Sequence, residues 1–318
     1  MTVKDFVGGA ARGFAASALA CSMLTAPLSS TAPPRDSKPR TFASAEDAVR
    51  ALAAAAKAGS LDEILALFGT GGEELIASSD PATLRRNRDV FTVAFAEGWR
   101  LVNQGADRKV LVVGNEGWPF PVPLVNDSRA WRFDTAAGKE EVLARRIGRN
   151  ELAVIDICRA YVAAQRRYAQ DEHDGKRAGL YAMTFRSDPG RQNGLYWPAA
   201  RGRKPSPLGD LVAQAATEGR PIAESRQSPT PFHGYYFKVL TGQGASAPGG
   251  AVSYVQDGEM SRGFALVAWP VEYDASGIMT FIVGQDGIVR QKDLGPETGA
   301  AAAAMTVYSP DASWSDVP

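Results

Sequence analysis

His233, one of the two histidines in the chain, lies in the segment PTPFHGYYFKVLTGQG at residues 229–244. An imidazole beside Tyr235 could act as a general base or contact a ligand, because it changes charge near neutral pH. Pro231 and Gly234, however, are typical of a turn that leads into a strand. In that second interpretation His233 is a polar residue at a strand entry, hydrogen-bonded to the TGQG loop or to backbone. The sequence favours the second interpretation.

Aromatic residues provide the candidate ligand-binding positions. Large rings with a polar tip line many binding clefts, including those for sugars and peptides. The candidates here are Trp118, Tyr196, Trp197 and Tyr235, and Trp269 has the same character. The three tryptophans in this set stand directly before prolines, a pattern equally suited to packing at strand ends. Both interpretations stay open.

An acidic turn is the nearest approach to a metal site. Residues 171–175, DEHDG, resemble part of a calcium loop, with Asp171 and Asp174 as the candidate ligands. The alternating ligands and the terminal glutamate of an EF-hand are missing. A helix that ends and unwinds at Gly175 explains the pattern better, so we predict no bound metal. Two histidines without an HExxH or CxxC motif also argue against the common zinc sites.

Motifs for nucleophilic catalysis and phosphate binding are missing from the sequence. There is no GxSxG elbow and no P-loop, and the glycine-rich TGQGASAPGG lacks the lysine and following helix of a phosphate cradle. A serine triad assembled from Ser206 or Ser246 with His233 has no support from spacing. We therefore expect no cofactor, and we expect a binding protein rather than an enzyme.

Composition places the chain among globular proteins and gives no reason to bind nucleic acid. Its 318 residues suffice for one large domain or two ordinary ones, and 45% of them are hydrophobic. Thirty-five basic residues balance thirty-five acidic ones. A neutral chain has no global electrostatic attraction to nucleic acid or to an anionic membrane.

The N-terminus has the pattern of a secretory signal peptide, which we assign to residues 1–32. A basic region precedes the apolar run GFAASALACSMLTAPL, and small residues follow it. The run is shorter than the roughly 20 residues of a spanning helix, so we expect no transmembrane anchor in the mature chain. An ALA motif before Cys21 fits a cleavage site and predicts a periplasmic protein. The alternative is a lipoprotein anchored through Cys21.

A proline-rich linker at 33–41 leads to an expected α+β subdomain at 42–148. Ser44 and Ser60 each precede an acidic residue three positions later and cap two helices, and Asp80 before a proline opens a third. Short alternating segments then indicate a small antiparallel sheet. Within it, WPFPVPLV has three prolines at spacing two, so this segment can only be an edge strand or an extended arm.

Residues 149–296 are expected to pack a long helix on an antiparallel β-meander. The helix continues from the first half with a break at Gly148, and Asn150 would cap its second piece. One face carries an apolar stripe formed by Leu152, Ile155, Cys158 and Val162.

Four or five short strands follow a further helix expected at 207–219. The QDG sequence at 285–287 is a turn signal between the last two strands. The tail, residues 297–318, should form a short alanine-rich helix and pack back on the fold through Trp314.

From about residue 42 to its end the chain resembles the family known as domain of unknown function 2950, which comprises uncharacterised exported bacterial proteins. The matching stretches include WPFPVPLV, WRFDTAAGKEEVLARRIGRNELAVI, PFHGYYFKVLTGQG, GFALVAWPVEY and GIMTFIVGQDGIVRQKDLGP. They cover most of the mature chain, and as a set they are specific. The resemblance implies no known activity.

The second half is also similar, more distantly, to the globular part of type IV pilin-like proteins. NELAVIDICRAYVAAQRRYA followed by FALVAWPV and FIVGQDGIVR has the same order of a helix and then strands. The resemblance implies a helix lying across one face of an antiparallel sheet. A pilin needs a long apolar N-terminal helix, whereas this chain has KEEVLARRIGR there, so we expect the fold without pilus assembly.

Together these patterns predict a non-enzymatic periplasmic protein that acts in envelope assembly or maintenance by binding an envelope protein or a cell-wall component. The alternatives are an envelope hydrolase that uses His233, or a protein that binds a small ligand in the cleft between its two halves.

Overall fold

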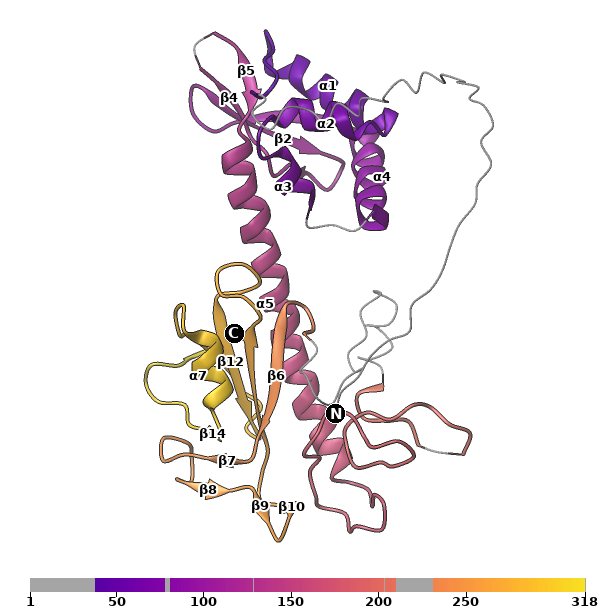
Figure 1. The fold of residues 1–318 in the computed structure, drawn as a ribbon, viewed down its shortest axis with the longest axis vertical. Coiled ribbons are helices and arrows are strands. Elements are labelled where there is room, and N and C mark those ends of the chain that lie inside the picture. Colours follow the sequence, from indigo (N-terminus) through magenta and orange to yellow (C-terminus); the bar gives the residue numbers. More distant parts are fainter. Residues whose placement is uncertain (1–37, 78–80, 128, 203, 210–230, 318) are drawn as a thin grey trace, which may run out of the picture.

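The computed structural model describes residues 38–77, 81–127, 129–202, 204–209 and 231–317. The expected signal peptide, most of the linker, the cap at Asp80 and most of the helix expected at 207–219 lie outside these residues. The described chain is an α+β protein, as the sequence predicted (Figure 1). It has an N-terminal lobe, drawn indigo to magenta, and a C-terminal lobe, drawn orange to yellow, and helix α5 (Thr135–Tyr168) runs from one to the other.

Four helices form one side of the N-terminal lobe. The Ser44 hydroxyl accepts a hydrogen bond from the Asp47 amide at 3.1 Å, and Gly59 ends the first helix with φ 67°, as the capping pattern predicted. Helix α3 was not predicted, because the glycine-rich segment at its start was interpreted only as the end of the preceding helix. The helices are α1 (Ala45–Ala58), α2 (Leu61–Phe68), α3 (Gly72–Ala77) and α4 (Pro81–Glu97).

The N-terminal sheet is antiparallel, and its strand order is β1-β2-β4-β5 with β3 paired to β2. The two-residue β3 is an edge strand, as the proline spacing predicted, but Leu124 and Val125 at the end of the same segment lie in β4 between two other strands, contrary to that prediction. The buried faces of α1, α2, β2 and β5 share one core, which includes Val49, Leu67, Leu111 and Phe133. The strands are β1 (Trp99–Asn103), β2 (Arg108–Val113), β3 (Trp118–Pro119), β4 (Leu124–Asn126) and β5 (Trp131–Phe133).

The C-terminal lobe contains the expected antiparallel meander, with strand order β15-β13-β12-β11-β6. The predicted turn at 285–287 joins β12 to β13. The tail returns to this sheet through β15, and Trp314 packs against the core of the lobe. The strands are β6 (Tyr235–Leu240), β11 (Ala265–Pro270), β12 (Met279–Gly284), β13 (Val289–Asp293) and β15 (Ser315–Asp316).

The segment AVSYVQ does not join the meander, contrary to expectation. It splits into two short strands that pair elsewhere, one with β7 and one with β10. The remaining elements are β7 (Gly242–Gln243), β8 (Val252–Ser253), β9 (Val255–Gln256), β10 (Glu259–Met260), α7 (Thr298–Ala304) and β14 (Val307–Tyr308).

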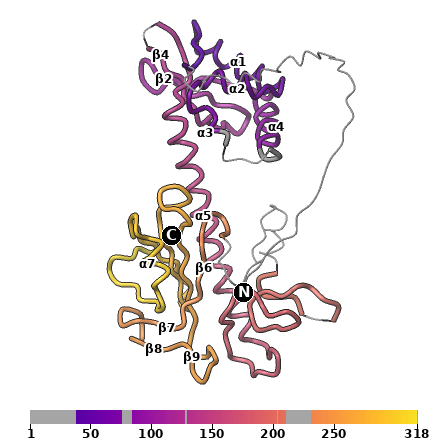
Figure 2. The backbone as a smooth tube through the Cα atoms, viewed as in Figure 1, coloured from indigo at the N-terminus to yellow at the C-terminus, as the bar shows by residue number. Residues whose placement is uncertain are grey.

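Helix α5 is continuous over 34 residues, so the predicted break at Gly148 is wrong (Figure 2). The predicted cap at Asn150 is wrong too, because its side chain amide donates to the Ser276 carbonyl at 2.8 Å. One glycine costs a helix about 1 kcal/mol, which tertiary contacts along the helix outweigh. The predicted boundary between subdomains at 148/149 therefore falls inside one helix that both lobes share.

The apolar face of α5 also differs from the predicted stripe. Leu152 is 66% exposed, whereas Val154 and Tyr161 are fully buried and join Ile155, Cys158 and Val162 against the sheet. This face is wider than a single stripe because it packs across β11, β12 and β13. Burial raises the pKa of the Cys158 thiol to about 12, as expected for a cysteine that serves as a small core residue.

Gly148→Ala should stabilise the protein by about 1 kcal/mol, because an added Cβ there has nothing within 4 Å and alanine favours the helix. The matched control is Gly138→Ala in the same helix, where the added Cβ would lie 2.8 Å from Val122 and should destabilise instead. Urea unfolding measures both. A loss of stability in the first variant would mean that the helix bends or breaks at Gly148.

Candidate functional site

A pocket of about 480 Å³ lies at the carboxyl end of α5. It brings together three of the residues that the sequence singled out, the candidate metal ligands Asp171 and Asp174 and the candidate ligand-binding residue Trp197. It also contains His173, to which the sequence assigned no role. The lining residues are Arg167, Asp171, Glu172, His173, Asp174, Gly190, Gln192, Trp197, Gly202, Lys204, Pro205 and Pro207.

A tight turn after α5 forms one wall of the pocket. The helix ends at Tyr168, and His173 and Lys176 then exchange backbone hydrogen bonds of 3.2 and 2.9 Å. Asp174 (φ 50°) and Gly175 (φ 76°) adopt left-handed conformations at the tip, which aspartate and glycine tolerate best. The glycine that was predicted to end the helix instead allows this turn, seven residues after the last helical residue.

Three buried rings in contact support the pocket, and two of them are stacked. The His173 ring lies 3.9 Å from Tyr168 with an interplanar angle of 18°, and 5.6 Å from the Trp197 ring. Its Nε2 lies 2.9 Å from the Tyr168 carbonyl, and because a carbonyl can only accept, Nε2 carries the proton. His173 is 8% exposed, and its Nδ1 has no hydrogen-bond partner within the described chain. Burial raises the pKa of Tyr168 to about 12, helped by the Asp174 carboxylate.

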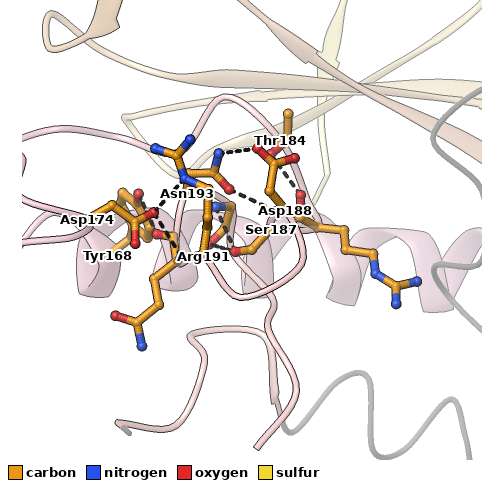
Figure 3. A network of polar contacts seen from close by, with 10 residues as sticks. Tyr168, Asp174, Thr184, Ser187, Asp188, Arg191 and Asn193 are labelled. Carbon is orange, nitrogen blue, oxygen red and sulfur yellow. Dashed lines mark hydrogen bonds and ion pairs between the residues drawn. The ribbon is translucent and has the colours of Figure 1, made fainter.

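The opposite rim belongs to a loop at 184–194 that polar contacts hold in place (Figure 3). The Asp174 carboxylate accepts from the Gln192 amide at 3.0 Å and from Arg191 Nε at 3.4 Å. Asp188 and Asn193 bond to each other twice, at 2.9 and 2.8 Å. One carboxylate at the helix end therefore fixes the backbone of the loop across the pocket.

The charges at the pocket fall into two groups. Asp171 forms an ion pair with Lys204 at 2.6 Å, and this hydrogen bond lowers the pKa of the Asp171 carboxyl. In contrast, no hydrogen bond or ion pair within the described residues engages the side chains of Arg167 and Glu172. The pocket thus has one guanidinium and one carboxylate available to a ligand.

The two candidate metal ligands do not gather with others. No group of three or more histidine, cysteine, aspartate and glutamate side chains in the described part of the chain is placed to hold a metal ion. Asp171 and Asp174 instead face the cationic side chains of Lys204 and Arg191. In this structure the two carboxylates join segments of the pocket wall to one another.

The other aromatic candidates do not share one site. Trp118 lies on β3 in the N-terminal lobe, 45% exposed, with the Arg145 guanidinium 5.5 Å from its ring. Tyr196 is half-buried and its backbone pairs with the 185–187 segment of the pocket loop. Tyr235 lies in the core of the C-terminal lobe, and its hydroxyl donates to the Met279 carbonyl at 3.0 Å. Trp269 is buried beside Tyr236.

His233 lies at the turn before β6, where the second interpretation of the sequence placed it. Its φ is 48°, and the flanking Phe232 and Tyr235 exchange backbone hydrogen bonds of 2.9 and 3.0 Å across the turn. Its ring contacts Phe232 edge-on, with 4.2 Å between ring centroids. His233 is not among the lining residues of the pocket. The histidine that lines the pocket is His173, in the DEHDG turn that the sequence analysis considered only for its acidic residues.

The fold and this site define an α+β protein with a polar pocket at the end of a long helix. Residues 39–317 match the family described as "Protein of unknown function (DUF2950)", and the chain belongs to that family. No curated protein and no solved structure matches the chain. None of the helices in the described ranges combines the length and the apolar composition that crossing a membrane requires.

Asp174→Gly should loosen the pocket rim, because it removes the carboxylate that accepts a hydrogen bond from the backbone amide of Gln192. Glycine tolerates the left-handed backbone conformation at position 174, so the turn itself should be kept. We expect the Gln192 amide to exchange with deuterium roughly tenfold faster, which corresponds to one lost hydrogen bond. Hydrogen exchange followed by mass spectrometry or NMR measures this. Glu172→Gly, in the same turn but without a contact to the loop, is the control, and equal effects of the two would contradict this role of Asp174.

Proposed function

We propose that this protein is a non-enzymatic, exported envelope protein that binds a small polar ligand in the pocket at the carboxyl end of α5. The observation that carries the proposal is the pocket itself, because its volume falls within the range of about 300–1,000 Å³ common for ligand sites. Its lining also combines charged side chains with rigid rings and prolines, the mixture that fixes the orientation of a ligand.

The pocket supports binding more than catalysis. A general base needs a nitrogen that is free to reach its substrate, but the Nε2–H of His173 donates a hydrogen bond to the Tyr168 carbonyl and its Nδ1 is buried. The hydrogen bond from Lys204 lowers the pKa of the Asp171 carboxyl, which argues against a role of Asp171 as a proton donor, and Asp174 is engaged by Arg191 and the backbone of the loop. Held by stacking and by hydrogen bonds, the walls resemble a preformed binding site.

Export is supported by the N-terminal sequence pattern alone. The basic region, the apolar run and the small residues before the first described helix have the order of a secretory signal. In the compartment that we propose, the ligand is a cell-wall component or a part of an envelope protein. Cys21 gives the alternative of a lipid anchor.

Native mass spectrometry of the protein purified from an envelope fraction tests the binding proposal. We expect a bound small molecule that is recovered chemically unchanged. Gln192→Trp, which places a large ring in the pocket lining, should abolish the adduct. Gln170→Trp, on the exposed side of the same helix end and outside the lining, should retain it. An adduct that survives in both variants, or a ligand that is released as a reaction product, would contradict the proposal.

Fractionation of bacteria that express the full-length chain tests export. We expect the protein in the periplasm with its N-terminus removed before residue 33, since the signal pattern occupies residues 1–32. Cys21→Ser separates the two alternatives, because it should leave the periplasmic form unchanged but would prevent lipid attachment. Retention of the intact chain in the cytoplasm would rule out both.

A further inference from the structure

Two opposite charges at the pocket form no hydrogen bond or ion pair within the described chain, although the Arg167 charge contributes to lowering the pKa of the Asp171 carboxyl. Arg167 lies in the last turn of α5, and Glu172 lies four residues after the helix ends. The other two carboxylates of the lining already have cationic partners, as described above. Both side chains line the pocket and charge-assisted hydrogen bonds are stronger than neutral ones, so these two side chains favour a ligand that carries both signs.

Arg167 and Glu172, two charged side chains of the lining, prefer different groups of a ligand. The Glu172 carboxylate favours an ammonium group. The guanidinium of Arg167 is planar and presents parallel N–H groups, the geometry that matches a carboxylate with two hydrogen bonds.

The uncharged part of the lining favours an aliphatic side chain over a sugar ring. A sugar stacks on an open aromatic face, whereas Trp197 is 3% exposed and its ring N–H donates to the Lys204 carbonyl at 2.9 Å. Pro205 and Pro207 add rigid apolar surface beside it. An aliphatic group can pack on these residues without losing hydrogen bonds that it would make in water.

We infer that the pocket recognises a zwitterionic amino acid or short peptide. Arg167 binds its carboxylate, Glu172 binds its ammonium group, and its aliphatic side chain packs against Pro205 and Pro207. This inference rests on the proposed function, because it names the class of ligand for the same pocket.

Calorimetric titration of the purified protein with trialanine tests the inference. Arg167→Gln and Glu172→Gln should each weaken binding by roughly ten- to a hundredfold, the effect of one charge-assisted hydrogen bond. Both side chains are exposed, so the variants should fold. Arg149→Gln and Glu140→Gln, which change exposed charges elsewhere on α5, should bind as the parent protein does.

Capped peptides assign each charge to its partner. N-acetyl-trialanine lacks the ammonium group, so it should bind weakly and show no further loss with Glu172→Gln. Trialanine amide lacks the carboxylate, so it should show no further loss with Arg167→Gln. Equal binding of free and capped peptides, or a variant effect that persists with the matching capped peptide, would overturn the inference.

Two results separate the inference from the proposed function. If a neutral trisaccharide binds and Gln192→Trp abolishes this binding, the pocket is a ligand site, but the assignment of a zwitterion is wrong. If neither trialanine nor the trisaccharide binds and no molecule accompanies the protein from the envelope, both the inference and the proposed function fail.

Discussion

One carboxylate ties α5 to two strands of the C-terminal sheet at the point where the helix reaches it. Glu151 Oε1 accepts from the backbone amides of Ile278 and Met279 at 2.9 Å each, and at 3.3 Å it shares the single proton of the Tyr235 hydroxyl with the Met279 carbonyl. These donors belong to the start of β12 and to β6, so one side chain joins the helix to two strands. Burial raises the pKa of the Tyr235 hydroxyl, and the neighbouring Glu151 charge raises it further, so the tyrosine stays a donor. The ring of Tyr235 lies directly on Gly277, where an added Cβ would collide with it.

This attachment determines where the pocket forms. With Glu151 fixed on the sheet, the next 17 residues of the helix pack their buried face on the meander, and the helix ends at Tyr168 beyond it. The chain must then reverse, and the backbone groups at the helix end must find partners. The His173 ring supplies one of them, and its stacking on Tyr168 places the acidic turn beside the helix end. The pocket is therefore a consequence of how a long helix ends.

Local signals predicted much of this fold. The serines before α1 and α2 cap those helices, the proline spacing identified β3 as an edge, and alternation with turn residues identified the main strands. Where tertiary contacts decide, prediction from sequence was wrong. Gly148 looked like a break, because its intrinsic preference is visible in the sequence and the contacts on either side of it are not.

In the candidate site, too, residue types were recognised from the sequence, whereas the contacts between distant residues were not. Asp171, Asp174 and Trp197 were singled out from residue type, but their common pocket was not foreseen, because Trp197 follows the acidic turn by a loop without a periodic pattern. His173 was missed for a related reason. Its position between Tyr168 and Trp197 depends on the turn that follows α5, and spacing along the chain carries no signal for that stack. His233 attracted attention through its aromatic neighbours, which are neighbours in sequence and mark a turn.

The contacts on either side of Gly148 explain why α5 tolerates a glycine. Before it, Arg145 bonds to the Pro119 carbonyl at 2.8 Å and lies 5.5 Å from the Trp118 ring, which ties the helix to the edge strand of the N-terminal lobe. After it, Asn150 bonds to the Ser276 carbonyl of the C-terminal lobe. Because both ends of this short stretch are held, unwinding at the glycine would have to break contacts with one lobe. Trp118 accordingly contributes to the attachment of the helix, and the pocket lies at the other end of α5.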